Sequence, residues 1–252
     1  MLIRAHYQGE AFFGGKAECD GEGNLDLALT IKEPAQETAA NAPFSETGGD
    51  PVNTLTGELF FHEPPDLNLG GPMPLYFQRY YASNLDGSTM SSNLGNNWRH
   101  NFDWTLSRAG SQCLVINPEG RVVSFEKTGD SWVQQSGKEI LYQLFEQTDG
   151  THTFYSPRDG RFYTFDVNGV LAKIEDGRGN AHYLFYSEYE GFFPGKLMEI
   201  SDTEDGSGRN LEFGYDSYAD SRKVTRVTEY QGSSLGRSVY FTYTGDDLTK
   251  AQ

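Results

Sequence analysis

The chain has 252 residues, of which 14% are aromatic and 29 are glycine, and it carries a net charge of −16 from 20 basic and 36 acidic residues. Abundant aromatic residues and glycine favour many short strands joined by tight turns, and helix is poorly supported along the sequence. The acidic balance argues against nucleic-acid binding, which depends on clustered Lys and Arg. No apolar stretch approaches the ~20 residues that span a membrane, and the N-terminus lacks the apolar run of a cleaved secretion signal.

Residues 1–33 are predicted to form a short N-terminal β segment. Leu25, Leu27 and Leu29 alternate with polar or small neighbours, as in a half-buried strand. Residues 34–48 then shift to Pro, Ala, Thr, Glu, Ser and Gly with almost no apolar anchor, which is the composition of a linker. We therefore expect a domain boundary in this stretch.

Residues 49–107 are predicted to form the next domain, which contains the runs GDPVNTLTGELFF, PMPLYFQRYYAS and NLGNNWRHNFDWTL. In the strand expected over 75–81, neither alternating face is plainly polar, so we expect both faces to be at least partly covered. Pro72 and Pro74 fit the start of this strand, where a missing N–H costs no ladder hydrogen bond.

Residues 108–164 are predicted to form a β meander, because short apolar runs alternate there with Gly-containing turns at roughly ten-residue spacing. The expected strands include 113–116, 121–125, 140–145, 151–155 and 161–165.

Residues 165–252 repeat themselves. An apolar residue recurs every 24 to 27 residues and is followed three positions later by a second one. These pairs are Leu171 and Ile174, Leu197 and Ile200, Val224 and Val227, and Leu248 and Ala251. An aromatic series, Phe185, Phe213 and Phe241, runs in phase with them at intervals of 28. Such periods indicate an array of supersecondary units that bury their apolar faces against one another. Residues three apart face opposite sides of a regular strand unless a bulge intervenes.

The first unit, FDVNGVLAKIEDGRGNAHYLFY at 165–186, resembles the repeat of the RHS/YD family. That family's pattern is an aromatic-Asp pair, a Gly, a Leu, then Asp, Gly and a closing aromatic strand. The matching residues are Phe165, Asp166, Gly169, Leu171, Ile174, Asp176, Gly179, Asn180 and Tyr186, with Leu197, Ile200, Phe213, Tyr215 and Phe241 in the looser later units. Tyr215 is still followed by Asp216, whereas Tyr243 is followed by Thr244.

The block at 49–107 resembles the domain that precedes RHS repeats in large bacterial polymorphic toxins, and we call it the pre-repeat domain. The residues that carry this resemblance, the pre-repeat motif, are Gly49, Asp50, Pro51, Thr56, Gly57, Pro74, Arg79, Tyr81, Gly95, Trp98 and His100. Residues 1–47 resemble nothing that we can name.

The resemblance implies an all-β fold, an antiparallel meander of hairpins forming a curved RHS/YD-repeat sheet that is part of a cocoon-like shell. It implies a non-catalytic role with no cofactor: enclosing, shielding or helping to deliver a toxin or effector in type VI secretion or contact-dependent competition. Expected partners are a toxin or effector domain or a further RHS shell chain, with a secretion-apparatus component and self-association through sheet edges as further candidates. The expected location is the bacterial cytoplasm, followed by secretion without a cleaved signal peptide.

Three or so repeats cannot close a compartment, so the open edges of the sheet must be capped, paired or docked on a partner. The alternative is a cell-surface interaction or carbohydrate-binding module that uses the aromatic sheet face. A hydrolase rests only on the abundance of carboxylates, because glycosidase chemistry needs two of them at a set separation.

The sequence assigns no catalytic, cofactor-binding or metal-ligating residue. The five histidines have no ligand spacing, and His100 is expected to be held by hydrogen bonds in an aromatic turn. Ser201, Thr203, Asp205 and Glu212 fall near calcium-loop offsets, but a solvated hairpin turn is the simpler interpretation. Asp50-Pro51 is read as a structural turn.

Overall fold

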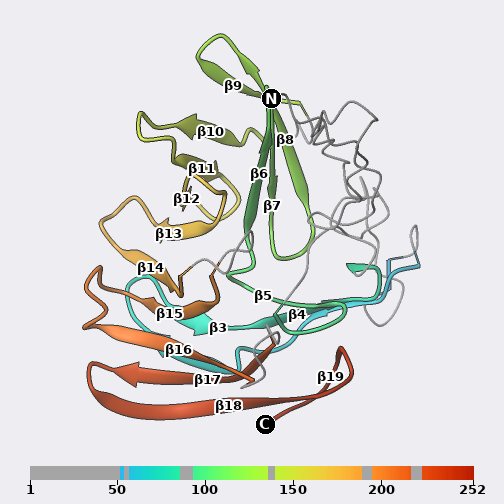
Figure 1. The fold of residues 1–252 in the computed structure, drawn as a ribbon, viewed down its shortest axis with the longest axis vertical. Coiled ribbons are helices and arrows are strands. Elements are labelled where there is room, and N and C mark those ends of the chain that lie inside the picture. The colour runs from blue at the N-terminus through green and yellow to red at the C-terminus, as the bar shows by residue number, and fades with distance from the viewer. Residues whose placement is uncertain (1–51, 54–56, 86–92, 136–139, 189–194, 217–222) are drawn as a thin grey trace, which may run out of the picture.

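The computed structural model describes residues 52–53, 57–85, 93–135, 140–188, 195–216 and 223–252. These residues form an all-β structure of antiparallel hairpins, which confirms the predicted fold class (Figure 1). In these ranges there is no helix of the length and hydropathy needed to cross a membrane. The segments predicted at 1–33 and 34–48 lie outside the described residues, as do Gly49, Asp50, Pro51 and Thr56 of the pre-repeat motif.

The first part of the chain makes three small sheets. A three-stranded sheet has the order β1-β4-β5, a two-stranded sheet pairs β2 with β3, and a four-stranded meander runs β6-β7-β8-β9. Their bounds are β1 Phe60–His62, β2 Leu67–Gly70, β3 Leu75–Phe77, β4 Arg79–Ala82, β5 Trp98–His100, β6 Thr105–Ala109, β7 Gln112–Ile116, β8 Val122–Thr128 and β9 Ser131–Gln134.

The second part is one ten-stranded antiparallel sheet, in which every strand pairs with its neighbours in sequence. The domain boundary expected between residues 164 and 165 therefore falls inside this sheet, within β12. Its strands are β10 Gln143–Glu146, β11 His152–Ser156, β12 Arg161–Phe165, β13 Leu171–Glu175, β14 Ala181–Tyr186, β15 Leu197–Ser201, β16 Arg209–Tyr215, β17 Val224–Gln231, β18 Ser234–Thr244 and β19 Asp247–Ala251.

The prediction of one strand over 75–81 is wrong in one respect. The structure has two strands there, β3 and β4, which belong to different sheets and are separated by Gln78. The backbone N–H of Gln78 donates to Asn101 Oδ1 at 3.0 Å, and its side-chain amide donates to the carbonyl of Glu63 at 2.8 Å. These bonds replace the ladder, so the chain passes from β3 into β4. Leu75, Phe77 and Tyr80 are buried, as expected for a run covered on both faces.

A β-bulge in each repeat turns both residues of the apolar pair inward. Leu171 pairs with Phe165 while Lys173 pairs with Thr164, so Ala172 is an extra residue and Ile174 returns to the buried face. The same register shift recurs where β15, β17 and β19 meet β14, β16 and β18. The spacing of three is therefore the sequence signature of the bulge.

The aromatic series needs a correction at its first member. Phe213 and Phe241 are buried, whereas Phe185 is only half-buried and its neighbour Leu184 faces the core. Phe213 and Phe241 lie two residues before Tyr215 and Tyr243, but Phe185 lies directly before Tyr186. Because side chains alternate along a strand, that one-residue difference places Phe185 on the other face.

The core lies between the ten-stranded sheet and the pre-repeat strands. Figure 1 shows the long sheet curving round β3, β5 and β6 to β8. The Phe77 ring of β3 lies 5.8 Å from that of Phe213 and 5.9 Å from that of Phe241. Among the described residues, the inner face of the sheet is thus packed against the pre-repeat domain and its neighbours.

Candidate functional site: the repeat units and the pre-repeat segment that they carry

Each repeat unit has a tyrosine in its second strand. The hydroxyl of this tyrosine donates to the backbone carbonyl of the first residue of the strand before it. The bonds are Tyr186 to Leu171 at 2.8 Å, Tyr215 to Leu197 at 2.7 Å and Tyr243 to Val224 at 2.6 Å. In every case the acceptor lies directly before the bulged residue. The hydroxyl therefore ties down the irregular start of the strand. The third unit keeps this bond although Thr244 follows its tyrosine.

We expect Tyr243→Phe to lower the free energy of unfolding by about 1 kcal/mol, because the Val224 carbonyl loses its donor while the packed ring stays. Tyr183→Phe is the matched control, since among the described residues the Tyr183 hydroxyl makes no hydrogen bond. Urea unfolding of both variants measures the difference. Equal losses in the two variants would show that the bond to Val224 contributes nothing specific.

The aspartates of the first unit organise its turns. Asp166 Oδ1 accepts the backbone N–H groups of Asn168 and Val170 at 2.9 and 2.8 Å. Asp176 repeats this arrangement with the N–H groups of Arg178 and Asn180. The side chain of Asn180 also donates to Asp176, and these hydrogen bonds lower the pKa of that carboxyl. Both aspartates therefore serve as turn acceptors.

Two glycines mark where the pre-repeat region touches the repeats. Gly169 has φ +81°, its carbonyl accepts the N–H of Leu106 at 3.1 Å, and an added Cβ would overlap the Leu106 carbonyl oxygen. Gly95 has φ +83°, and an added Cβ there would overlap the Asp246 carbonyl oxygen. That oxygen accepts the N–H of Asn96 at 2.8 Å. Gly169 belongs to the repeat motif and Gly95 to the pre-repeat motif, so each motif supplies one close backbone contact.

Arg79 forms a buried two-point ion pair with Asp66. Its Nε lies 2.7 Å from Asp66 Oδ2 and its Nη2 lies 3.0 Å from Asp66 Oδ1. The guanidinium also lies 5.1 Å from the ring of Trp98 and 6.0 Å from that of Phe241. Because Phe241 belongs to β18, Arg79 links the pre-repeat domain to the third repeat unit.

His100 is held in its turn by hydrogen bonds, as expected from the sequence. Its Nδ1 accepts the N–H of Phe102 at 3.3 Å, and its Nε2 lies 3.0 Å from Asp103 Oδ1. Burial lowers the pKa of His100, and Asp103 partly opposes this. The ring packs 5.4 Å from Phe77 and 5.7 Å from Phe213. A neutral, buried imidazole that is packed between rings and hydrogen-bonded through Nδ1 has a structural role.

The other described residues of the pre-repeat motif have structural surroundings as well. Tyr81 stacks on Phe61 at 5.3 Å and packs against Trp98 at 5.1 Å. Gly57 takes a positive φ of 71° and Pro74 is exposed just before β3. Of the repeat residues, those that face the core are Phe165, Leu171, Ile174, Leu197, Ile200, Phe213 and Phe241.

The acidic loop with calcium-like spacing is a hairpin turn between β15 and β16. Thr203 Oγ1 accepts the N–H of Gly208 at 2.8 Å, and Asp205 Oδ1 accepts the N–H of Ser207 at 3.1 Å. Ser201 is buried, and Glu212 lies opposite Glu199 in the strand ladder. Within the ranges that the structure describes, no three His, Cys, Asp or Glu side chains converge as a metal site.

The buried side chain of His182 is expected to make the stability of the fold depend on pH. His182 Nε2 lies 3.2 Å from the Met73 carbonyl, and burial lowers its pKa from 6.5 to about 4. The unfolded chain therefore binds this proton first as the pH falls, so the stabilisation that is complete above pH 6.5 is lost towards pH 4. We expect His182→Gln to reduce the slope of unfolding free energy against pH in this window by up to about 1.4 kcal/mol per pH unit. Urea unfolding at pH 7, 6, 5 and 4 tests this, and an unchanged slope would contradict it.

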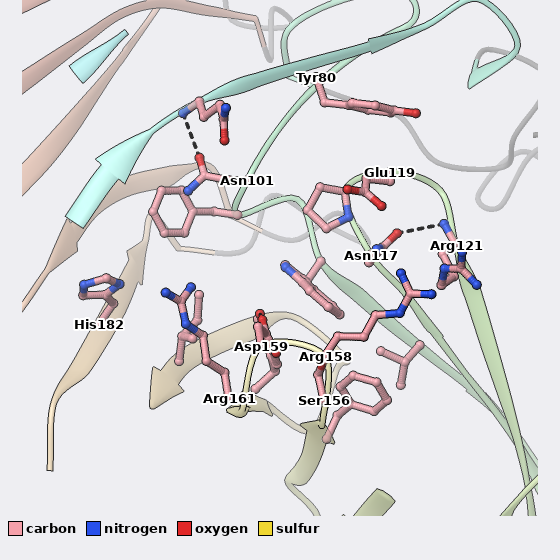
Figure 2. Close-up of a pocket in the computed structure, with 18 of the residues that line it drawn as sticks. Tyr80, Asn101, Asn117, Glu119, Arg121, Ser156, Arg158, Asp159, Arg161 and His182 are labelled. Atoms are coloured by element: carbon pink, nitrogen blue, oxygen red, sulfur yellow. Dashed lines mark hydrogen bonds between the residues drawn. The ribbon is translucent and has the colours of Figure 1, made fainter. Parts of the chain in front are cut away.

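A polar cavity of about 340 Å³ was not foreseen from the sequence (Figure 2). It lies between the residues that follow β5, the β7–β8 turn at 117–121 and the β11–β12 turn at 156–161. Arg121, Arg158 and Arg161 line it, together with the carboxylates of Glu119 and Asp159. Both turns contain a proline and end in Gly-Arg, and this shared pattern is the one sign of the cavity in the sequence. The sequence does not show that the two turns lie together in the fold.

Residues 49–125 match the family described as "Domain of unknown function (DUF6531)". The match covers the pre-repeat domain and continues through β6 and β7 into β8. A comparison with curated proteins gives no match. The chain is thus a β-rich protein that carries a DUF6531 domain, packed against a ten-stranded antiparallel sheet.

Proposed function

We propose that the chain is a non-catalytic segment of an RHS-type β shell that encloses, shields or helps deliver a toxin or effector in a bacterial secretion or competition system. The observation that carries the proposal is the recurrence of one structural unit. Three successive units of one continuous sheet share two features. Each has two inward-facing apolar residues with a bulge between them, and each has a later tyrosine whose hydroxyl donates to the backbone carbonyl of the first of those two residues. Such an array extends by adding units, because each contacts only its neighbours.

The seating of the pre-repeat domain supports an end position in such a shell. Phe77, Arg79 and His100 of this domain pack on the inner face of the repeat sheet, against Phe213 and Phe241. In such a shell, the pre-repeat domain would cover the apolar inner face at one end. The repeat units of the rest of the shell would then curve round a cargo. On this proposal the protein leaves the bacterial cytoplasm together with that cargo, and a toxin domain or a further shell chain completes the open sheet edges.

The mass of the purified chain in solution tests the proposal. Light scattering is measured on the chain alone and after co-expression with each protein encoded beside it. We expect a stable complex with a toxin or shell chain, because three units leave sheet edges that need a partner. A monodisperse species of 28.2 kDa under all conditions would contradict the shell and favour a self-contained binding module.

The alternative of a carbohydrate-binding module depends on aromatic rings grouped on an exposed face. Among the described residues, the exposed large aromatic side chains are Phe145 and Tyr240, which lie on β10 and β18, far apart in the order of the sheet. Most other rings pack against one another in or near the core. We therefore retain the shell as the proposed function, and a glycan array on the intact chain would test the alternative.

A further inference from the structure

The cavity between the β7–β8 and β11–β12 turns concentrates arginine in a protein that is otherwise strongly acidic. In Figure 2, the side chain of Arg158 extends from the β11–β12 turn towards Arg121 of the β7–β8 turn, and Arg161 rises from the same turn as Arg158. The positive charges of Arg158 and Arg121 both act on the hydroxyl of Tyr142, which lines the cavity. The guanidinium groups therefore share one polar space.

The carboxylates that line this cavity have other partners. Glu119 Oε1 lies 3.1 Å from His62 Nε2, and this hydrogen bond is the main cause of a lowered pKa for Glu119. Asp159 accepts the hydroxyl of Tyr163. Among the described residues, neither acid forms an ion pair with Arg158 or Arg161, which form hydrogen bonds with the phenols of Tyr142 and Tyr163.

Four arginines of the described residues form an ion pair with an acidic side chain. The ion pairs are Arg79 with Asp66, Arg108 with Glu146, Arg209 with Asp202, and Arg237 with Glu229. In the part of the chain that the structure describes, Arg158 and Arg161 form no ion pair, and both line the same partly open cavity. Guanidinium groups that outnumber the carboxylates of a cavity and are not paired with them are suited to an anion, because their N–H donors match the oxygens of carboxylate or phosphate.

We propose that this cavity is a binding site for a small molecule that carries a carboxylate or phosphate group, held by Arg158 and Arg161 with Arg121 facing them. The volume of about 340 Å³ is at the lower end of the range for small-molecule sites, so it suits a single sugar acid or a phosphorylated monosaccharide. The rings of Trp104 and Tyr142 line the cavity beside the guanidinium groups and offer an apolar wall to such a ring. The site is independent of the proposed shell function, which stands on the repeat sheet.

Isothermal titration calorimetry on the intact chain tests the site, with sodium phosphate and sodium glucuronate as separate probes at constant ionic strength. We expect saturable binding of at least one probe in the millimolar range or tighter. Binding of phosphate alone assigns the phosphate class, and binding of glucuronate alone assigns the carboxylate class. Absence of saturable binding for both probes would overturn the proposal.

Variants locate the binding. The double variant Arg158→Gln/Arg161→Gln is expected to bind about tenfold or more weakly, because each lost charged donor weakens the complex. The double variant Arg178→Gln/Arg226→Gln makes the same change in net charge at exposed positions outside the cavity and is expected to bind like the wild type. Arg158→Gln alone, at an exposed turn position, repeats the test if the double variant does not fold. Equal weakening by the control double variant would overturn the proposal.

Discussion

Arg79→Ala is expected to lower the free energy of unfolding by about 3–5 kcal/mol, because it leaves the Asp66 carboxylate without its partner in a desolvated site. The side chains of Arg79 and Asp66 are 10% and 14% exposed, so solvent offers the remaining charge little compensation. The truncation also removes the guanidinium from the rings of Trp98 and Phe241. Urea unfolding followed by tryptophan fluorescence measures the loss.

Two further variants separate the ion pair from the loss of side-chain volume. Asp66→Asn keeps the shape of its side chain and leaves the guanidinium unpaired, so it should also destabilise strongly. Lys173→Ala removes one partner of an exposed pair with Glu175 and should cost less than about 1 kcal/mol. If Asp66→Asn were as mild as Lys173→Ala, the predicted contribution of the buried pair to stability would be contradicted.

Gly169→Ala is expected to destabilise the protein by about 3 kcal/mol or more, because it adds a backbone clash to the strain of a positive φ. The new Cβ would overlap the Leu106 carbonyl oxygen, and the Gly169 φ of +81° disfavours any side chain. The hydrogen bond from the Leu106 N–H to the Gly169 carbonyl should be lost as β6 moves away. Hydrogen exchange at the Leu106 amide reports this local effect together with global unfolding.

Gly160→Ala is the matched control for this contact. Gly160 has a similar φ of +67°, but an added Cβ there meets no atom within 4 Å. Its expected cost is therefore only that of the backbone conformation, about 1–2 kcal/mol. Equal losses of unfolding free energy at the two positions, with unchanged hydrogen exchange at the Leu106 amide, would contradict the prediction. The close approach of Gly169 to Leu106 would then not contribute to the packing of the pre-repeat domain on the repeats.

Local pattern predicted most of the β structure that the described residues show. The glycine turns and apolar runs between 108 and 165 placed strands that correspond to β7, β8, β10, β11 and β12. The spacing of three between Leu171 and Ile174 left two alternatives, opposite faces of the strand or a bulge, and the structure has the bulge. These features depend on neighbours in sequence, which is why pattern alone can find them.

Other features depend on contacts between distant segments and could not be predicted in this way. The division of 75–81 at Gln78 depends on Asn101, and the inward face of β14 is set by the position of Leu184 relative to Tyr186. The arginine cavity forms only because the turns at 117–121 and 156–161 meet in space. The motif residues Arg79 and His100 could be named from the resemblance, but their buried partners came from the fold.

Protease protection of a bound effector tests the proposed shell function most directly. The effector encoded beside this chain is purified free and in complex with it, and both samples are digested with the same nonspecific protease. The proposal predicts that the free effector is degraded quickly while the bound effector survives, because the sheet shields it. Degradation at the same rate in both samples would show that the chain does not enclose or shield its partner, and would contradict the proposed function.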